Sequence, residues 1–207
     1  MDMLNSFEAD ALKEIGSIGM GNATTSLSKL VNRSVRLNLS DAGMLQQEKV
    51  AMMIPESITM AGVMLKLEGD LMGVALLLFE FNNAVFLSDL MIGDPEHSND
   101  PEMHESALAE LGNILTGSYT GAITSFLDIE VRHYAPEIAI GTILKILKRA
   151  SSLIANEPDE ILNIETMFMV HGAGDGKGLN TIYGDMFLLL DPASLGKLRE
   201  SIGRMLA

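Results

Sequence analysis

Cysteine is absent from the 207 residues, which excludes disulfides, thiolate metal sites and cysteine catalysis and favours a reducing compartment. Tryptophan is also absent and aromatic residues make up only 5%, so Leu, Ile, Val and fifteen Met residues must fill the core. Basic residues are scarce, because 14 Lys and Arg stand against 28 Asp and Glu, for a formal net charge of −14. This balance disfavours nucleic acid or an anionic membrane as a partner, since either needs a concentrated basic surface.

No apolar stretch is long enough to cross a membrane. The longest lies near Met72–Phe79 and is interrupted by Gly73, far short of the about 20 residues that a spanning helix needs. The N-terminal residues MDMLNSFEAD lack the basic start and apolar run of a signal peptide. We therefore expect a cytoplasmic protein with no membrane insertion.

Complete motifs for phosphate, dinucleotide or metal binding are lacking as well. In the loop HGAGDGKG, His171 stands where a phosphate-binding loop needs its first glycine, and Gly178 stands where it needs a hydroxyl. The segment GSIGMGN departs from the dinucleotide fingerprint because Thr24 replaces the third glycine and no strand precedes it. The histidines show no metal-ligand spacing and are expected at the surface or at an edge (His97, His104, His133 and His171). The sequence therefore predicts no metal site and no cofactor of its own.

What the sequence does contain is an internal repeat. Shifting it by 96 residues lays Asp10–Ser40 over Ser106–Pro136, with several identical pairs that include Glu14 and Glu110. Farther along, the segments EGDLMGVALLLFE and NTIYGDMFLLLDP resemble each other, and a helical segment follows each. Such a period is too long for a solenoid and indicates a duplicated half-domain. We expect one domain over residues 1–207, made of half-repeats 1–97 and 98–207.

The apolar patterning predicts an α+β protein, in which an antiparallel sheet is flanked by long helices and a pseudo-twofold axis relates the two halves. The expected helices are Phe7–Leu30, Asn82–Met91, a long helix that starts at Asp100–Glu102, Ile138–Ile154 and Ala193–Leu206. The expected strands are Val35–Leu39, Val50–Ile54, Gly62–Leu67, Leu71–Phe81, Glu165–Val170 and Thr181–Leu190. Gly93–Pro101 is the expected linker. Ile138–Ile154 has no clear counterpart in the first half.

Both long helices are rich in glycine, and each interior glycine costs roughly 1 kcal/mol relative to alanine. Close packing of the two helices on each other would compensate for this cost. The glycines expected at that contact are Gly16, Gly19, Gly21, Gly112, Gly117 and Gly121.

One stripe of the second long helix carries three polar side chains, Ser106, Glu110 and Asn113, at spacings of four and three residues. On a single helix, such a stripe is more often an ordinary solvated face than a site. Its near-repetition as Asp10, Glu14 and Ser17 favours a functional role.

The pattern is completed by Pro136, which follows Asn113 after twenty-two intervening residues. Ser106, Glu110, Asn113 and Pro136 resemble the signature of the CheC/CheX/FliY family of chemotaxis phosphatases, which dephosphorylate the response regulator CheY. The resemblance covers essentially the whole chain. The CheC branch fits best, because FliY carries an additional flagellar-switch domain and CheX is a shorter chain that acts as a dimer.

The resemblance implies a hydrolase in which Glu110 pairs with a lysine of CheY and Asn113 orients the water that attacks the aspartyl phosphate. Ser106 would support Glu110 or set the helix start, and Pro136 would be structural, ending the strand that backs the helix. The Mg²⁺ would come from the partner's phosphorylation site. The first copy keeps the acids but has Ser17 where Asn is expected and Ser40 where Pro is expected. We therefore expect one working site and one degenerate site.

A non-catalytic adaptor is the alternative from a different class. Such a chain would bind CheY or the receptor deamidase CheD, a known partner of CheC-type proteins, and the lost carboxamide of the first copy agrees with that role. The basic run Lys145, Lys148 and Arg149 is expected as the solvated face of a helix, with a docking patch for an acidic partner as the other possibility.

Overall fold

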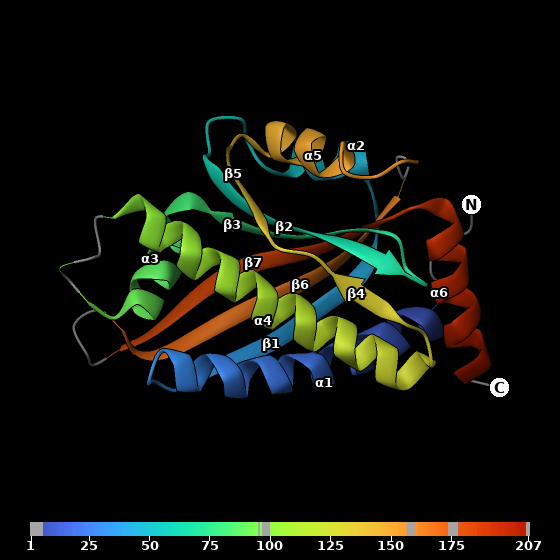
Figure 1. Cartoon of the computed structure of the whole chain (residues 1–207), viewed down its shortest axis with the longest axis horizontal. Helices are drawn as coiled ribbons and strands as arrows, with labels where there is room; N and C mark the ends of the chain where they lie inside the picture. Colours follow the sequence, from blue (N-terminus) through green and yellow to red (C-terminus); the bar gives the residue numbers. More distant parts are fainter. Residues whose placement is uncertain (1–5, 95, 97–99, 157–159, 174–177, 206–207) are drawn as a thin grey trace.

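The computed structural model describes residues 6–94, 96, 100–156, 160–173 and 178–205 (Figure 1). Within these residues, six helices accompany a seven-stranded antiparallel sheet. The elements in chain order are α1 (Ser6–Leu30), β1 (Val35–Gln46), α2 (Gln47–Met53), β2 (Met60–Gly69), β3 (Gly73–Glu80), α3 (Phe81–Ile92), α4 (Pro101–Leu127), β4 (Val131–His133), β5 (Glu137–Gly141), α5 (Ile143–Ser151), β6 (Glu160–Ala173), β7 (Gly178–Leu190) and α6 (Pro192–Met205).

The strand order reads the same from both edges of the sheet. It runs β1-β6-β7-β3-β2-β4, with β5 also paired to β2. The equivalent strands of the two halves are β1 and β4–β5, β2 and β6, and β3 and β7. Exchanging each strand for its equivalent and reading the sheet from the opposite edge gives the same order. Each half therefore places its first strand beside the hairpin of the other half, and β3 meets β7 at the centre. The duplicated, pseudo-twofold α+β fold is confirmed. The half-repeat boundary between residues 97 and 98 lies outside the described residues.

Both copies interrupt their first strand at the equivalent position. In the first copy, the β1–β6 register shifts between Leu39 and Asp41. In the second, Pro136 separates β4 from β5, which both pair with β2. Proline has no N–H to donate to a ladder, so it favours such a break. A bulge at position 40 gives a similar interruption without proline.

The sheet separates two apolar layers (Figure 1). Helices α1, α3, α4 and α6 cover one face, where Leu12, Tyr119 and Phe168 belong to the larger core cluster. Helices α2 and α5 lie across part of the other face, over a smaller cluster that contains Met64 and Ile146. Alternate residues of β3 thus enter different cores, which explains the almost unbroken apolar run of this strand.

Helices α1 and α4 run antiparallel along the sheet and pack where α1 carries glycines (Figure 1). A Cβ at Gly19 would lie 2.8 Å from the carbonyl oxygen of Ser118 and 3.0 Å from the Cα of Tyr119. Gly16 faces the Tyr119 ring. The expected helix–helix contact is confirmed for these two glycines. It is wrong for the other four. Gly112 packs on Val63 and Leu65 of β2, Gly117 faces His133, and a Cβ at Gly21 or Gly121 would meet nothing within 4 Å.

The close approach at Gly19 predicts a large effect on stability. We expect Gly19→Ala to lower the free energy of unfolding by roughly 1–3 kcal/mol, because the new methyl group meets backbone atoms that cannot rotate away. Gly21→Ala is the matched control, since its Cβ would meet nothing within 4 Å. The control should gain up to about 1 kcal/mol of stability from helix propensity alone. Urea denaturation of both variants measures the difference, and equal shifts would contradict the packing contact.

Two expected elements were wrong. Val50–Ile54 is not a strand, because Gln47–Met53 forms α2, which buries Val50 and leaves Met52 82% exposed. The five consecutive apolar residues suggested a strand, but they belong to a helix that buries only one side. Ile138–Ile154 is not a single helix either, because β5 ends at Gly141 and α5 starts after the N-cap Thr142. Helix α5 does have a counterpart, since α2 occupies the same place in the first half and contacts it.

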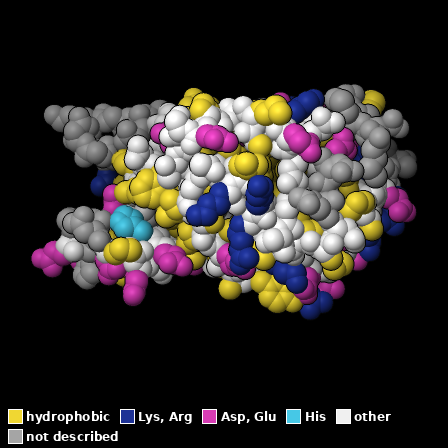
Figure 2. All heavy atoms as spheres, turned by 90° about the horizontal axis from the view of Figure 1, so that it is seen from above, with side chains coloured by type: hydrophobic (Ala, Val, Ile, Leu, Met, Phe, Trp, Pro, Cys, Tyr) yellow, Lys and Arg dark blue, Asp and Glu magenta, His cyan; other side chains and the backbone are white. Residues whose placement is uncertain are grey.

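The remaining expectations concern the glycine-rich loop, the basic residues of α5 and the absence of a membrane-spanning helix. β6 and β7 form the expected hairpin around the glycine-rich loop, whose residues 174–177 lie outside the described part. The basic run of α5 is exposed. Figure 2, which views the molecule from above relative to Figure 1, shows Lys and Arg side chains near the middle of the surface. Arg149 also forms an ion pair with Glu137. Among the described helices, none combines the length and apolar character that crossing a membrane requires.

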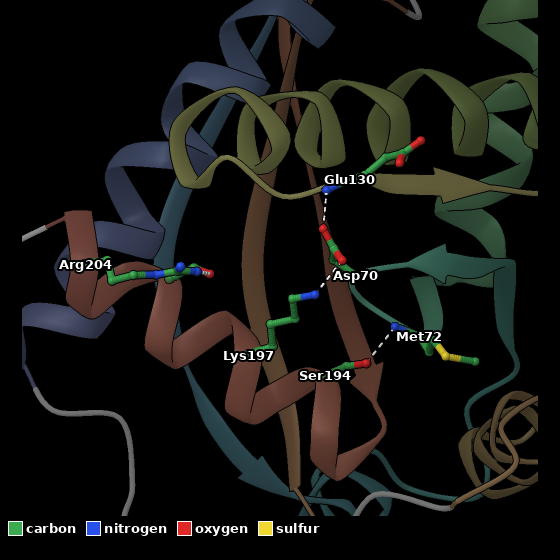
Figure 3. Close-up of polar contacts among 7 residues, drawn as sticks. Asp70, Met72, Glu130, Ser194, Lys197 and Arg204 are labelled. Carbon is green, nitrogen blue, oxygen red and sulfur yellow. Dashed lines mark hydrogen bonds and ion pairs between the residues drawn. The ribbon is translucent and has the colours of Figure 1, made fainter.

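A polar junction ties α6 to the turn between β2 and β3 and to the segment after α4 (Figure 3). The Asp70 carboxylate accepts a hydrogen bond from the ammonium of Lys197. It also accepts one from the backbone N–H of Glu130, at 2.8 Å. Ser194 accepts from the backbone N–H of Met72 at 2.8 Å. The Lys197 ammonium, followed by the Glu130 N–H, lowers the pKa of Asp70. This junction holds α6, the β2–β3 turn and the segment between α4 and β4 together.

Asp185 carries the opposite perturbation and makes stability depend on pH. Burial, assisted by the Glu165 carboxylate directly across the β6–β7 ladder, raises the pKa of Asp185 to about 6. The folded state therefore binds the Asp185 proton more tightly than the unfolded chain does. The resulting stabilisation is complete below about pH 4 and is lost as the pH rises through about 6. We expect Asp185→Asn to raise the free energy of unfolding by on the order of 1 kcal/mol at pH 8 and to change little at pH 4. Equal stabilisation at both pH values in urea titrations would contradict the assignment.

Candidate functional site

Helix α4 begins as its sequence predicts. The Asp100 carboxylate accepts a hydrogen bond from the backbone N–H of Glu102 at 3.0 Å, and Pro101 occupies the first helical position. The helix thus starts five residues before Ser106. A helix-start role for Ser106 is therefore wrong, and within the described residues no hydrogen bond joins Ser106 to Glu110.

The predicted stripe faces outward along α4. Ser106 and Glu110 are exposed and Asn113 is partly exposed, while Leu108, Leu111 and Leu115 are buried on the other side. Among the residues that the structure describes, no ion pair or hydrogen bond engages the side chains of Glu110 or Asn113. Their polar capacity is therefore available to another molecule.

The first copy lies on α1 with the same orientation. Asp10, Glu14 and Ser17 are all exposed. Because the helices are antiparallel and cross near Gly19 and Ser118, Ser17 and Asn113 are offset by roughly 10 Å along the helix axes. The structure therefore brings the members of each stripe together but keeps the two stripes apart as separate surfaces.

The β4–β5 segment flanks the second stripe. Strand β4 and strand β5 both contact α4, and the partly exposed Pro136 lies between them. Pro136 thus interrupts the edge strand beside the helix, in agreement with the structural role expected for it. His133, the last residue of β4, has its ring against Gly117 of α4, and its Nε2 would lie 3.3 Å from a Cβ at that glycine. The sequence predicted a surface or edge position for His133 but no connection with the stripe.

A Ser–His–Asp cluster occurs elsewhere and has a structural role. The Ser88 Oγ lies 2.6 Å from His104 Nδ1, and His104 Nε2 lies 3.8 Å from an Asp89 carboxylate oxygen. Ser88 is fully buried, and its hydroxyl donates to the carbonyl of Val85 within α3. The cluster attaches α3 to the first turns of α4.

The stripe offers a carboxylate and a carboxamide on a rigid helix. A carboxylate can pair with a lysine, and a carboxamide can donate and accept hydrogen bonds at a fixed separation. Within the described ranges, no group of three or more His, Cys, Asp or Glu residues could hold a metal ion. The arrangement suits positioning chemistry on a partner that supplies its own reactive group.

The two repeated segments match a known family model. Residues 7–38 and 103–140 match the model of the CheC-like family, and these ranges contain both stripes and Pro136. Over these two segments the chain is similar to the CheC-like family. The predicted resemblance is confirmed, and the family model matches each copy separately.

Two curated proteins of Bacillus subtilis (strain 168) are similar to this chain. The CheY-P phosphatase CheC is 26% identical over 204 residues, which cover 96% of this chain and 95% of that protein. The flagellar motor switch phosphatase FliY is 28% identical over 143 residues, or 68% of this chain, and the match spans only 37% of FliY. Among solved structures, Thermotoga maritima FliY shares the fold with a TM-score of 0.77 at 20% identity, covering 98% of both chains.

Proposed function

We propose that this CheC-like chain hydrolyses the aspartyl phosphate of a CheY-type response regulator in chemotaxis signalling, using one intact site on α4. The supporting observation is that Glu110 and Asn113 lie on one open stripe, with no partner among the described residues. The near full-length similarity to a CheY-P phosphatase supports the same reaction.

Glu110 would set the docking geometry. CheY is a doubly wound α/β protein, and the functional site of such a fold lies at the carboxyl ends of its strands. A lysine of that site would pair with the Glu110 carboxylate, which is exposed on α4. This pairing would place Asn113, three residues farther along the helix, at the phosphoryl group.

Asn113 would hold the attacking water. Its NH₂ group can donate toward the phosphoryl region while its oxygen accepts from a water in line with the bond that breaks. Positioning of this kind lowers a phosphoryl-transfer barrier without a covalent intermediate on the phosphatase. The partner would bring its own Mg²⁺, which neutralises charge on the phosphoryl oxygens.

The first stripe would contribute little turnover. Ser17 has a single hydroxyl close to the backbone, so it cannot reach the phosphoryl group and the water simultaneously. Asn22 does not substitute for it, because it lies eight residues beyond Glu14, more than two helical turns away.

The alternative is an adaptor that binds a CheY-type regulator or CheD with little hydrolysis. The observation that favours it is the serine in place of the carboxamide in the first copy. The two functions differ in one measurable rate, the loss of phosphate from the regulator.

A decay assay separates them. A purified CheY-type regulator is phosphorylated with a small phosphodonor, the donor is removed, and the remaining acyl phosphate is followed with and without this protein. We expect catalytic amounts of the chain to accelerate the decay. Binding of the phosphorylated regulator without any acceleration would overturn the phosphatase and support the adaptor.

A further inference from the structure

His133 has an unusual position for an edge-strand histidine. It pairs with Leu67 of β2 at the end of β4, and its partly buried ring leans on α4 at Gly117. A methyl group at Gly117 would lie 3.3 Å from Nε2, closer than ordinary van der Waals contact. The imidazole therefore occupies a place that the helix leaves open by having no side chain there.

Gly117 belongs to the same stripe as the candidate site. It follows Asn113 by four residues, a spacing that puts Cβ positions about 5–6 Å apart on one helix face. Side chains on a helix lean toward its N-terminus, so the Asn113 side chain is directed away from Gly117. One water that hydrogen-bonds to both His133 Nε2 and the Asn113 carboxamide would span up to about 6 Å, similar to the spacing of these two helix positions.

The two ring nitrogens of His133 are not equivalent. Nδ1 is buried and has no hydrogen-bond partner within the described residues. An N–H buried without an acceptor is more costly than a buried lone pair, so the neutral ring favours the proton on Nε2. The donor of His133 therefore lies on the side of the ring that contacts α4.

The repeat provides an internal comparison. Shifting by 96 residues replaces His133 by Leu37 and Asn113 by Ser17. Leu37 packs against the larger core, and a Cβ at Gly21, the counterpart of Gly117, would meet nothing within 4 Å. The copy without the carboxamide thus also lacks an imidazole beside the stripe.

We propose that His133 is a positioning residue of the α4 site, an inference that rests on the proposed phosphatase function. Its Nε2–H donates to a bridging water, and that water donates to the Asn113 oxygen. The bridge fixes which way the carboxamide points. The NH₂ group is then directed at the partner's phosphoryl group, and the second lone pair of the amide oxygen remains for the attacking water.

Three substitutions at one position test this inference. Glutamine can present a donor near the position of Nε2, asparagine can present one only near Nδ1, and phenylalanine presents none. We expect His133→Phe and His133→Asn to lower kcat roughly tenfold with KM within twofold. His133→Gln should stay within about threefold of the wild-type kcat. Thermal unfolding of each variant accompanies the kinetics.

Gly117→Ala approaches the same contact from the helix, and Gly121→Ala is its matched control because its Cβ would meet nothing within 4 Å. Both should gain helix stability. Only Gly117→Ala should lose kcat, by roughly threefold, because its methyl group displaces the ring.

Equal responses of the Gln and Asn variants would overturn the positioning role, whether both retain activity or both lose it. So would full activity of His133→Phe in a protein that Asn113→Ala inactivates, and that result would leave the phosphatase function intact. A wild-type chain that never accelerates phosphate loss would overturn both.

Discussion

Replacing Asn113 by alanine is expected to slow the hydrolysis of a phosphorylated CheY-type regulator by roughly 10²–10³-fold, the range found when one preorganised transition-state donor is removed. Binding of the regulator should change little, because the carboxamide acts on the water and the phosphoryl group more than on the docking surface. The fold should persist, since Asn113 is partly exposed on α4 and alanine favours helix. Acyl-phosphate decay and a binding titration with each variant measure the two quantities.

The repeat provides the control. Ser17→Ala changes the equivalent position of α1 and should leave both turnover and affinity unchanged. Asn113→Asp keeps the shape of the side chain but replaces the NH₂ donor by a charged oxygen, so it should be as inactive as Asn113→Ala. An Asn113→Ala chain that cleared the phosphorylated regulator at the native rate would refute the role assigned to this residue.

Reversing the charge at Glu110 is expected to raise KM at least tenfold while kcat falls by less than about threefold. A lysine opposite the partner's lysine puts like charges together, which costs several kcal/mol at an interface and is felt mainly in association. Because Glu110 is exposed, the effect should shrink as salt is added. Steady-state kinetics of Glu110→Lys at low and high ionic strength measure it.

Glu14→Lys is the matched variant, because it changes the net charge by the same amount on the equivalent position of α1. It should leave KM close to the wild-type value. A Glu14→Lys chain with the same rise in KM would show that overall charge, and not the α4 stripe, governs docking. A collapse of kcat at constant KM in Glu110→Lys would instead place Glu110 in the chemical step.

The sequence predicted the architecture because the duplication constrained it. Once the halves were recognised, two long helices and two hairpins on an antiparallel sheet followed, and the α4 cap at Asp100 was predicted in detail. Short elements were harder. Val50–Ile54 is apolar at all five positions, so its pattern favours neither a helix nor a strand. Only the packing of α2, which begins at Gln47 and buries Val50, distinguishes the two. Gly112 could not be assigned to β2 or α1, since spacing alone does not choose between two close neighbours.

The candidate stripe was predictable because its three residues lie within eight positions of one helix, where spacing determines the face. Their exposure agrees with the prediction, whereas their catalytic roles remain proposals. The position of His133 beside Gly117 could not have been predicted, because it depends on how the β4 edge lies against α4. The 96-residue shift pairs His133 with Leu37, but neighbouring pairs such as Asn38 and Tyr134 differ as much, so the sequence did not single His133 out.

A structure of the chain bound to a CheY-type regulator whose aspartate carries a beryllofluoride phosphate mimic is the most direct measurement. We predict that the regulator docks on α4, that Glu110 contacts its active-site lysine, and that the Asn113 carboxamide lies about 2.7–3.2 Å from the mimic or from a water in line with it. A regulator seated on the α2 and α5 face, with Asn113 open to solvent, would contradict the central claim.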